Sequence, residues 1–120
     1  MGQPINRVTP AILPVGKFVS IHLPAAMKRL YKGYSMRGTF RTGDVLTVCP
    51  LSMEDIAVGD VIVYESPNFD EREEVAHRVI GQYGNGLVTR GDSSLKKDPG
   101  IVTQGMLLGR VCSRYRSNHI

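Results

Sequence analysis

The sequence predicts a mostly β protein of short, mainly antiparallel strands, and two kinds of local signal support this. First, β-branched runs follow two copies of Gly-Asp-Val, which begin at Gly43 and Gly59. Glycine supplies a positive-φ turn position and aspartate bonds nearby backbone, so each copy is typical of a turn that enters a strand. Second, the Tyr-Gly-Asn-Gly segment at residues 83–86 is a strong hairpin signal. Short strands with glycine turns and little helix indicate an all-β domain.

The first part of the chain gives weaker signals. Residues 1–15 are rich in proline and lack periodicity, so we expect a loose N-terminal arm. Residues 16–22 alternate apolar and polar side chains, which favours a strand. Residues 25–31 fit either a helical turn or an irregular lead into a strand.

The later segments are clearer. We expect strands at residues 45–49, 61–64, 75–81, 87–90 and 107–112. Ser52 can begin one short helical turn over residues 52–55, and Thr103 can cap another brief turn. The polar segments 66–74 and 91–100 predict exposed loops.

A length of 120 residues with 42% hydrophobic residues predicts one domain with one core. We divide the chain into the arm at 1–15, the domain at 16–113 and a basic tail at 114–120. The net charge of +4 is mild. Three arginines near the C-terminus could contact nucleic acid or anionic lipid, and a solvated tail is the preferred interpretation. They are Arg110, Arg114 and Arg116. A nucleic-acid-binding barrel is disfavoured, because only 7% of residues are aromatic and none is tryptophan.

The two cysteines, Cys49 and Cys112, lie in apolar segments. Buried free thiols are the default interpretation, with a single disulfide left open. No Cys-x-x-Cys motif or histidine cluster suggests a metal site, and we expect no cofactor. No apolar stretch approaches the ~18 residues that span a bilayer. We therefore expect a cytoplasmic or soluble protein, with no transmembrane segment or signal peptide and at most peripheral membrane contact, unless an anchor has been trimmed.

Four residues carry candidate chemistry. Ser35 follows a glycine-containing turn, where a hydroxyl can be exposed and backbone N–H groups can face an oxyanion. His77 lies in an apolar strand segment, and an imidazole titrates near neutral pH, as a general base requires. Asp92 and Asp98 lie in one polar loop, and a base histidine needs such an acceptor. Each of these residue types alone is more often structural.

Together with their neighbours these residues form a series of short motifs. The motifs are Ser35-Met36, Gly43-Asp44, residues 59–62, residues 77–79, residues 90–92 and residues 109–111. Their order resembles that of the signal-peptidase family, which includes the self-cleaving LexA-type repressors. The resemblance covers about residues 32–112.

The resemblance implies a signal-peptidase/LexA-like coiled β-barrel with Ser35 as nucleophile. His77 stands where the archaeal and endoplasmic-reticulum type has its base. Around the nucleophile, Gly33, Tyr34 and Met36 would shape the oxyanion site. The substrate would be an extended peptide, with small residues before the cut, lying against an edge strand.

Between the two aspartates, we expect Asp98 to orient His77. Asp98 precedes Pro99, which biases it toward an extended conformation and lets its side chain reach a neighbouring strand. Asp92 directly follows Gly91, the usual setting of a turn aspartate, so we expect a mainly structural role.

The expected function is serine endopeptidase activity in signal- or leader-peptide maturation, acting on a peptide or precursor protein. The chain departs from the family pattern at Gly33, usually a hydroxyl residue, and at Gly38, usually proline. These departures motivate the alternative of a non-catalytic peptide-binding module. A self-cleaving repressor-type domain is a further alternative, disfavoured because the lysine base is absent and a helix-turn-helix has no room. The oligomeric state stays open.

Overall fold

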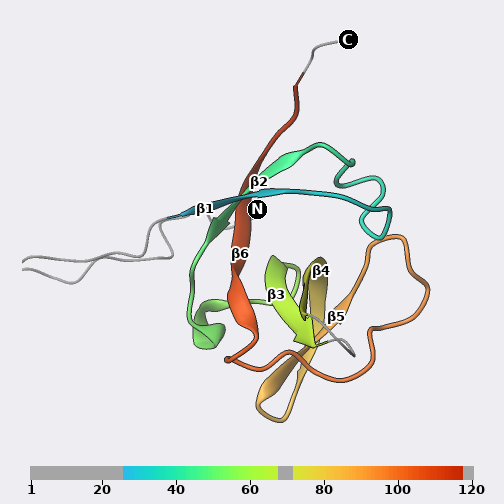
Figure 1. The fold of residues 1–120 in the computed structure, drawn as a ribbon. Coiled ribbons are helices and arrows are strands. Elements are labelled where there is room, and N and C mark those ends of the chain that lie inside the picture. Colours follow the sequence, from blue (N-terminus) through green and yellow to red (C-terminus); the bar gives the residue numbers. More distant parts are fainter. Residues whose placement is uncertain (1–25, 68–71, 118–120) are drawn as a thin grey trace, which may run out of the picture.

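The computed structural model describes residues 26–67 and 72–117. Within them one antiparallel sheet of six strands runs in the order β1-β2-β6-β3-β4-β5 (Figure 1). The strands are β1 (Met27–Leu30), β2 (Val45–Cys49), β3 (Val61–Pro67), β4 (Arg72–Tyr83), β5 (Gly86–Arg90) and β6 (Leu107–Tyr115). A short 3-10 helix, η2, spans Met53–Asp55.

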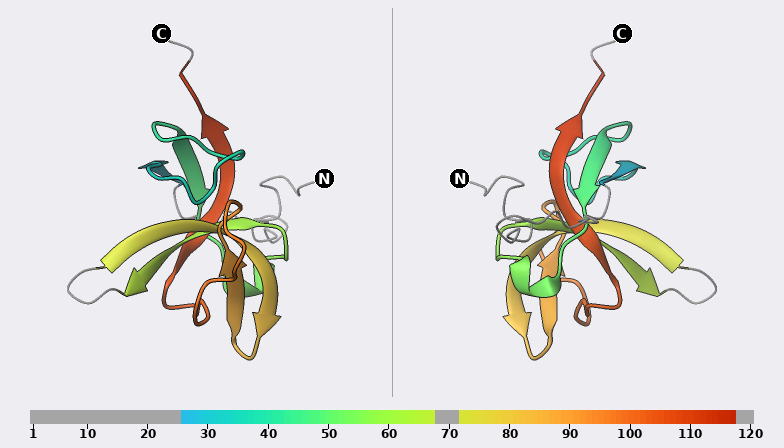
Figure 2. Two further views of the ribbon diagram at one scale, coloured as in Figure 1. Left: turned by 90° about the vertical axis from the view of Figure 1, so that its right-hand side faces the viewer. Right: turned by 90° about the vertical axis from the view of Figure 1, so that its left-hand side faces the viewer.

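The predicted mostly β, antiparallel class is confirmed, but the sheet is not closed into a barrel. β1 and β5 lie at its two ends and do not pair with each other. The long strand β6 joins the two halves, because its first residues pair with β3 and its last residues pair with β2 (Figure 2). Register shifts at Thr47/Val48 and at Val63/Tyr64 interrupt both pairings. Such irregularities bend a strand and increase its twist.

Each face of this sheet carries its own hydrophobic cluster. One cluster contains Ile56, Ile62, Tyr64, Val79, Leu87 and Val102. The other contains Tyr31, Met36, Phe40, Leu46 and Val61. The neighbours Val61 and Ile62 fall in different clusters, because successive side chains of a strand point to opposite faces. His77 lies directly opposite Ile62 and therefore points to the face of the first cluster.

The structure corrects several predicted boundaries. The segment 66–74, expected as an exposed loop, is largely strand, since β3 continues to Pro67 and β4 begins at Arg72. These residues pair across the hairpin, with Ser66 opposite Glu73. Their pairing shows that backbone hydrogen bonds extend a hairpin whose polar sequence lacks hydrophobic alternation.

Other predicted elements hold. The strand at residues 45–49 is β2, and the open choice at residues 25–31 is settled by β1. The hairpin turn at Gly84 is confirmed between β4 and β5. The turn after Ser52 is present as η2, although Ser52 forms no side-chain cap hydrogen bond. The arm at residues 1–15 and the strand at 16–22 lie outside the described residues.

Cys49 and Cys112 form a disulfide that joins the neighbouring strands β2 and β6. Their Cα atoms lie 6.3 Å apart, within the range that disulfides span. Cys112 is skipped by the register between the strands, where Val48 pairs with Val111 and Thr47 pairs with Ser113. The interpretation of both cysteines as free thiols is therefore wrong in this structure.

Two of the three C-terminal arginines form ion pairs within the fold and are not part of a freely solvated tail, contrary to expectation. Arg110 is only 4% exposed and lies 3.8 Å from the carboxylate of Asp60. Arg116 makes two 2.8 Å hydrogen bonds to Asp44, which is 1% exposed. Arg114 is exposed as expected. Residues 114 and 115 thus continue β6, and Arg116 anchors its end on the turn that precedes β2.

The surroundings of the Asp44 carboxylate predict how the stability of the fold changes in acid. Hydrogen bonding to Arg116 lowers the pKa of Asp44 from 3.8 to about 2. Because the pKa is depressed in the folded state, the ionised group stabilises the fold above its ordinary pKa, and this stabilisation is lost as pH falls through about 2. We expect Asp44→Asn to lose about 1–3 kcal/mol at neutral pH.

Urea unfolding of wild type and Asp44→Asn, repeated from neutral pH down to about pH 2, measures this contribution. The gap between the two proteins should close on acidification. The exposed carboxylate of Glu54 supplies the control, because Glu54→Gln should match wild type throughout. A gap that stays constant with pH would show that the Asp44 charge does not stabilise the fold.

Candidate active site

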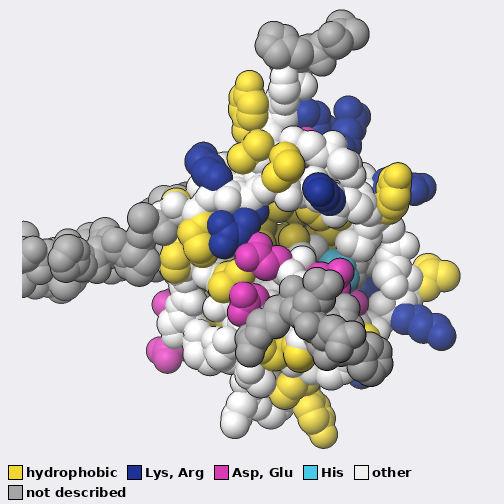
Figure 3. Space-filling view, viewed as in Figure 1, with side chains coloured by type: hydrophobic (Ala, Val, Ile, Leu, Met, Phe, Trp, Pro, Cys, Tyr) yellow, Lys and Arg dark blue, Asp and Glu magenta, His cyan; other side chains and the backbone are white. Residues whose placement is uncertain are grey.

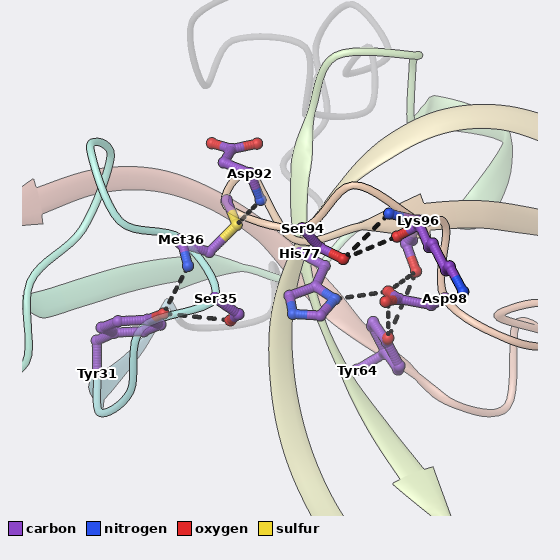
Figure 4. A network of polar contacts seen from close by, with 10 residues as sticks. Tyr31, Ser35, Met36, Tyr64, His77, Asp92, Ser94, Lys96 and Asp98 are labelled. Carbon is purple, nitrogen blue, oxygen red and sulfur yellow. Dashed lines mark hydrogen bonds and ion pairs between the residues drawn. The ribbon is translucent and has the colours of Figure 1, made fainter.

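Ser35 lies in the turn that joins β1 to β2, with its side chain on the exposed side. The next residue, Met36, is 0% exposed and packs with Phe40 in the hydrophobic cluster beneath the turn. The backbone N–H of Asp92 also points at the Met36 sulfur, at 3.2 Å (Figure 4). Because the Met36 side chain is buried under the turn, the side chain of the preceding residue, Ser35, faces the exposed side.

His77 projects from β4 toward Asp98, the partner expected from the sequence. Nδ1 of His77 lies 2.5 Å from Oδ2 of Asp98, and the two side chains are 14% and 21% exposed. A proton on Nδ1 directed at Asp98 leaves Nε2 with a lone pair that can accept a proton.

The Asp98 carboxylate is itself held by hydroxyl groups. Thr89 Oγ1 donates to Oδ2 at 2.7 Å and Tyr64 donates at 3.4 Å. Thr89 is 2% exposed, and burial raises the pKa of Tyr64, so its hydroxyl remains a donor. The backbone N–H of Asp98 bonds the carbonyl of Thr89, at 2.8 Å. These contacts hold the Asp98 carboxylate, which accepts the hydrogen bond from His77, in place against β5.

Gly91 brings Ser35 and His77 together. A Cβ atom built at Gly91 would lie 3.1 Å from His77 Nε2, 3.1 Å from Ser35 Cβ and 2.8 Å from the Ser35 carbonyl. The side chains of Ser35 and His77 therefore both lie next to Gly91, and Ser35 is on the side of the imidazole away from Asp98 (Figure 4). The Ser93 N–H bonds the Ser35 carbonyl at 2.8 Å and pins the two loops together. Only glycine leaves room for this approach.

Asp92 lies beside this pair and does not contact His77 in any described hydrogen bond. It accepts two hydrogen bonds from Arg78, at 2.8 and 2.7 Å, and one from Thr39, at 2.5 Å. Hydrogen bonding to Arg78 lowers the pKa of Asp92. Asp92 therefore connects the Ser35 turn, which contains Thr39, with the strand that carries His77.

Tyr31 is a functional candidate that the sequence did not indicate. Its hydroxyl accepts the backbone N–H of Met36 at 3.1 Å and lies 3.4 Å from Ser35 Oγ. Among the residues proposed for the oxyanion site, Tyr34 is instead 74% exposed, with Arg37 stacked on its ring. Gly33 bonds Thr42 through its backbone. The only signal for Tyr31 was its aromatic ring four residues before Ser35.

A groove of about 450 Å³ runs past Ser35 and His77. Its apolar wall contains Leu30, Tyr31, Leu46, Val63, Val75 and Ala76. Five consecutive residues of β4, at positions 73–77, line it. Since neighbouring residues of a strand point to opposite faces, a groove that touches all five follows the edge of the strand. Among residues 26–67 and 72–117 no strand pairs with that edge, because β5 pairs with β4 only from Arg78 onward.

The opposite wall of the groove is β1, the end strand of the sheet. Arg29 of β1 bonds Glu74 of β4 at 2.8 Å, so an ion pair joins the two walls. Acidic and basic side chains gather around the hollow beside the histidine on this face of the molecule (Figure 3). The site therefore combines a hydroxyl, an imidazole and a carboxylate with a groove lined by residues of β1 and β4.

No family model, curated protein or solved structure matches this chain. Within residues 26–67 and 72–117, no group of three His, Cys, Asp or Glu side chains is placed to hold a metal ion. The same part of the chain contains no helix long and apolar enough to cross a membrane.

Proposed function

We propose that this chain is a serine endopeptidase of the signal-peptidase kind, with Ser35 as nucleophile, His77 as general base and Asp98 as its orienting carboxylate. The observation that carries the proposal is the linear arrangement of these side chains. Asp98 bonds Nδ1 of His77. On the other side of the ring, Nε2 lies next to Gly91, and Ser35 also lies next to Gly91.

The arrangement supports acyl transfer in two steps. Nε2 takes the hydroxyl proton as Ser35 Oγ bonds the substrate carbonyl carbon, and Asp98 stabilises the imidazolium that forms. The imidazolium then gives this proton to the leaving amine as the C–N bond breaks, which leaves an ester on Ser35. Water, deprotonated by His77, hydrolyses the ester and restores the hydroxyl. In the free structure Ser35 Oγ contacts Tyr31, and substrate would draw it toward Nε2.

The groove supports an extended peptide as substrate. A peptide strand laid along the free edge of β4 gains main-chain hydrogen bonds without any change in the sheet. The apolar wall beside Ser35 suits a small, apolar side chain on the residue whose carbonyl Ser35 attacks, as signal and leader peptides carry. The Arg29–Glu74 pair is exposed to solvent on both side chains, so a substrate could displace it at little cost in free energy.

Labelling with a serine-reactive aryl phosphonate tests the proposal directly. We expect one adduct, on Ser35, since only a serine beside a base is nucleophilic enough to react. The labelling rate should rise with pH and then level off, because only neutral imidazole accepts the proton. His77→Ala should slow labelling by at least about 10²-fold.

Ser94 provides the control, because it lies in the same region but bonds the carbonyl of Lys96. Ser94→Ala should label like wild type. Failure to label Ser35 in folded protein would overturn the peptidase proposal and favour a non-catalytic peptide-binding role for the groove.

A further inference from the structure

We infer that the Tyr31 hydroxyl is a donor to the oxyanion, supplying what the chain lacks at Gly33; this rests on the proposed peptidase function. Hydrolysis through Ser35 places a negative charge on the former carbonyl oxygen, and preorganised donors must face that oxygen. The backbone N–H of Ser35 makes no hydrogen bond to a described residue. The N–H of Met36 is already donated to Tyr31. One donor is therefore in place and a second is needed.

The hydrogen bonds of Tyr31 leave its own proton available. Its oxygen accepts the Met36 N–H at 3.1 Å, so the hydroxyl proton points elsewhere. The nearest described acceptor is Ser35 Oγ, at the long distance of 3.4 Å. Once Oγ bonds the substrate carbon, the oxyanion is two bonds from Oγ, on the same carbon, and within reach of the same proton.

Tyr31 is also held in place for this role. It is 7% exposed, and its ring packs at 5.4 Å between centroids against Phe40. Yet it lines the groove, so its hydroxyl can meet substrate. A buried, positioned hydroxyl loses little on reorganisation, which is the condition under which an oxyanion donor is effective.

Tyr31→Phe removes the hydroxyl and keeps the ring. We expect kcat for a cleaved peptide to fall about 10²-fold with KM nearly unchanged. The melting temperature should fall modestly, because the buried Met36 N–H loses its acceptor. A peptide aldehyde, which forms a tetrahedral adduct on serine, should bind about 10²-fold more weakly. Tyr115→Phe, at an exposed tyrosine outside both hollows, is the matched control and should behave as wild type.

Wild-type kcat in folded Tyr31→Phe, or unchanged aldehyde affinity, would overturn the inference while leaving the peptidase proposal intact. If Tyr31→Phe does not fold, 3-fluorotyrosine at position 31 provides the test. This residue has a more acidic hydroxyl, so kcat should change if the hydroxyl donates to the oxyanion and should stay the same if the hydroxyl only supports the fold. A wild-type protein that cleaves no peptide and forms no adduct would instead overturn the peptidase proposal itself.

A second inference comes from a separate cleft. We propose that this cleft, of about 460 Å³, holds the side chain of the second substrate residue before the cut. Its lining includes Tyr64, Val75, Asp98, Ile101, Val102 and Met106. It shares Val75 and His77 with the Ser35 groove, so the two hollows meet at the active site.

The direction of a bound peptide strand leads to this assignment. A strand on the free edge of β4 sends successive side chains to opposite faces of the sheet. Ser35 lines only the first groove, so the residue whose carbonyl it attacks places its side chain there. The preceding side chain then points to the other face, where the cleft is mainly apolar. A bulky aliphatic or aromatic residue fits, and would cover the His77–Asp98 pair from water.

Digestion of a peptide library, with the cut sites mapped by mass spectrometry, tests this preference. We expect Leu or Phe at the second position before the cut, with kcat/KM about tenfold or more above Gly. Ser66→Phe, which fills the cleft, should remove that preference. Val58→Phe, at an exposed residue outside the cleft, should keep it. Equal cleavage of Gly and Leu peptides would overturn this inference alone, and absence of any cleavage would overturn the peptidase proposal.

Discussion

Replacing Ser35 by alanine should lower kcat for peptide cleavage by at least about 10⁴-fold. In the proposed mechanism the hydroxyl oxygen forms the bond to the substrate carbonyl, and Ser35 lies next to Gly91, as does Nε2 of His77. The measurement is cleavage of a peptide found in the library digest, followed by mass spectrometry under single-turnover conditions. The residual rate should not depend on His77, since a base without its nucleophile contributes little.

The fold of this variant should be unchanged. The Ser35 side chain makes one described contact, the 3.4 Å approach to Tyr31, while the contact that pins the loop uses the Ser35 backbone carbonyl. Alanine keeps that carbonyl, so the melting temperature should stay within about 2 °C of wild type. Ser94→Ala is again the control, with full activity. Substantial cleavage by pure, folded Ser35→Ala would assign the nucleophile elsewhere.

The departures from the family pattern at Gly33 and Gly38 have a backbone explanation. Both residues adopt positive φ, 116° at Gly33 and 93° at Gly38. Proline cannot adopt such a φ, and other side chains rarely do, so this turn needs glycine at both places. The sequence showed the missing hydroxyl at Gly33, but only the folded turn shows that Tyr31 lies beside Ser35.

Strand positions could be predicted where hydrophobic pattern and turn chemistry agreed. β2 was predicted at its observed boundaries, because a Gly-Asp turn precedes a β-branched run that is buried on alternate residues. The β3–β4 hairpin was predicted too short, since Ser66 and Glu73 are polar and their pairing depends on register alone.

Contacts between strands that are far apart along the chain could not be predicted from the sequence. Cys49 and Cys112 are separated by 63 positions, and their disulfide depends on β6 lying between β2 and β3. The ion pair between Arg116 and the buried Asp44 depends on the same placement. The contact between His77 and Asp98 was expected because Pro99 extends the chain there, and the structure has it. The free edge of β4, which forms the groove, follows from where β5 stops pairing and has no local signal.

Replacing Asp98 should mainly lower kcat, whereas replacing Asp92 should mainly lower the stability of the fold. Asp98→Asn keeps the shape of the side chain but removes the charge that stabilises the imidazolium and selects the Nδ1 proton. We expect kcat to fall about 10²–10⁴-fold with a small change in melting temperature, since Thr89 can still donate to the amide oxygen. Asp92→Asn should do the reverse, because its carboxylate bonds Arg78 and Thr39 and not the base.

For Asp92→Asn we expect a loss of about 1–3 kcal/mol in unfolding free energy at neutral pH, and a much smaller loss of kcat than in Asp98→Asn. The sign with pH follows from the direction of the shift. Hydrogen bonding to Arg78 lowers the pKa of Asp92, so its stabilisation is present above the ordinary aspartate pKa and disappears as pH falls through the folded value. Urea unfolding should therefore show the variant approaching wild type in acid. If instead Asp92→Asn abolished turnover at unchanged stability and Asp98→Asn only weakened the fold, Asp92 would be the carboxylate that supports His77 during catalysis.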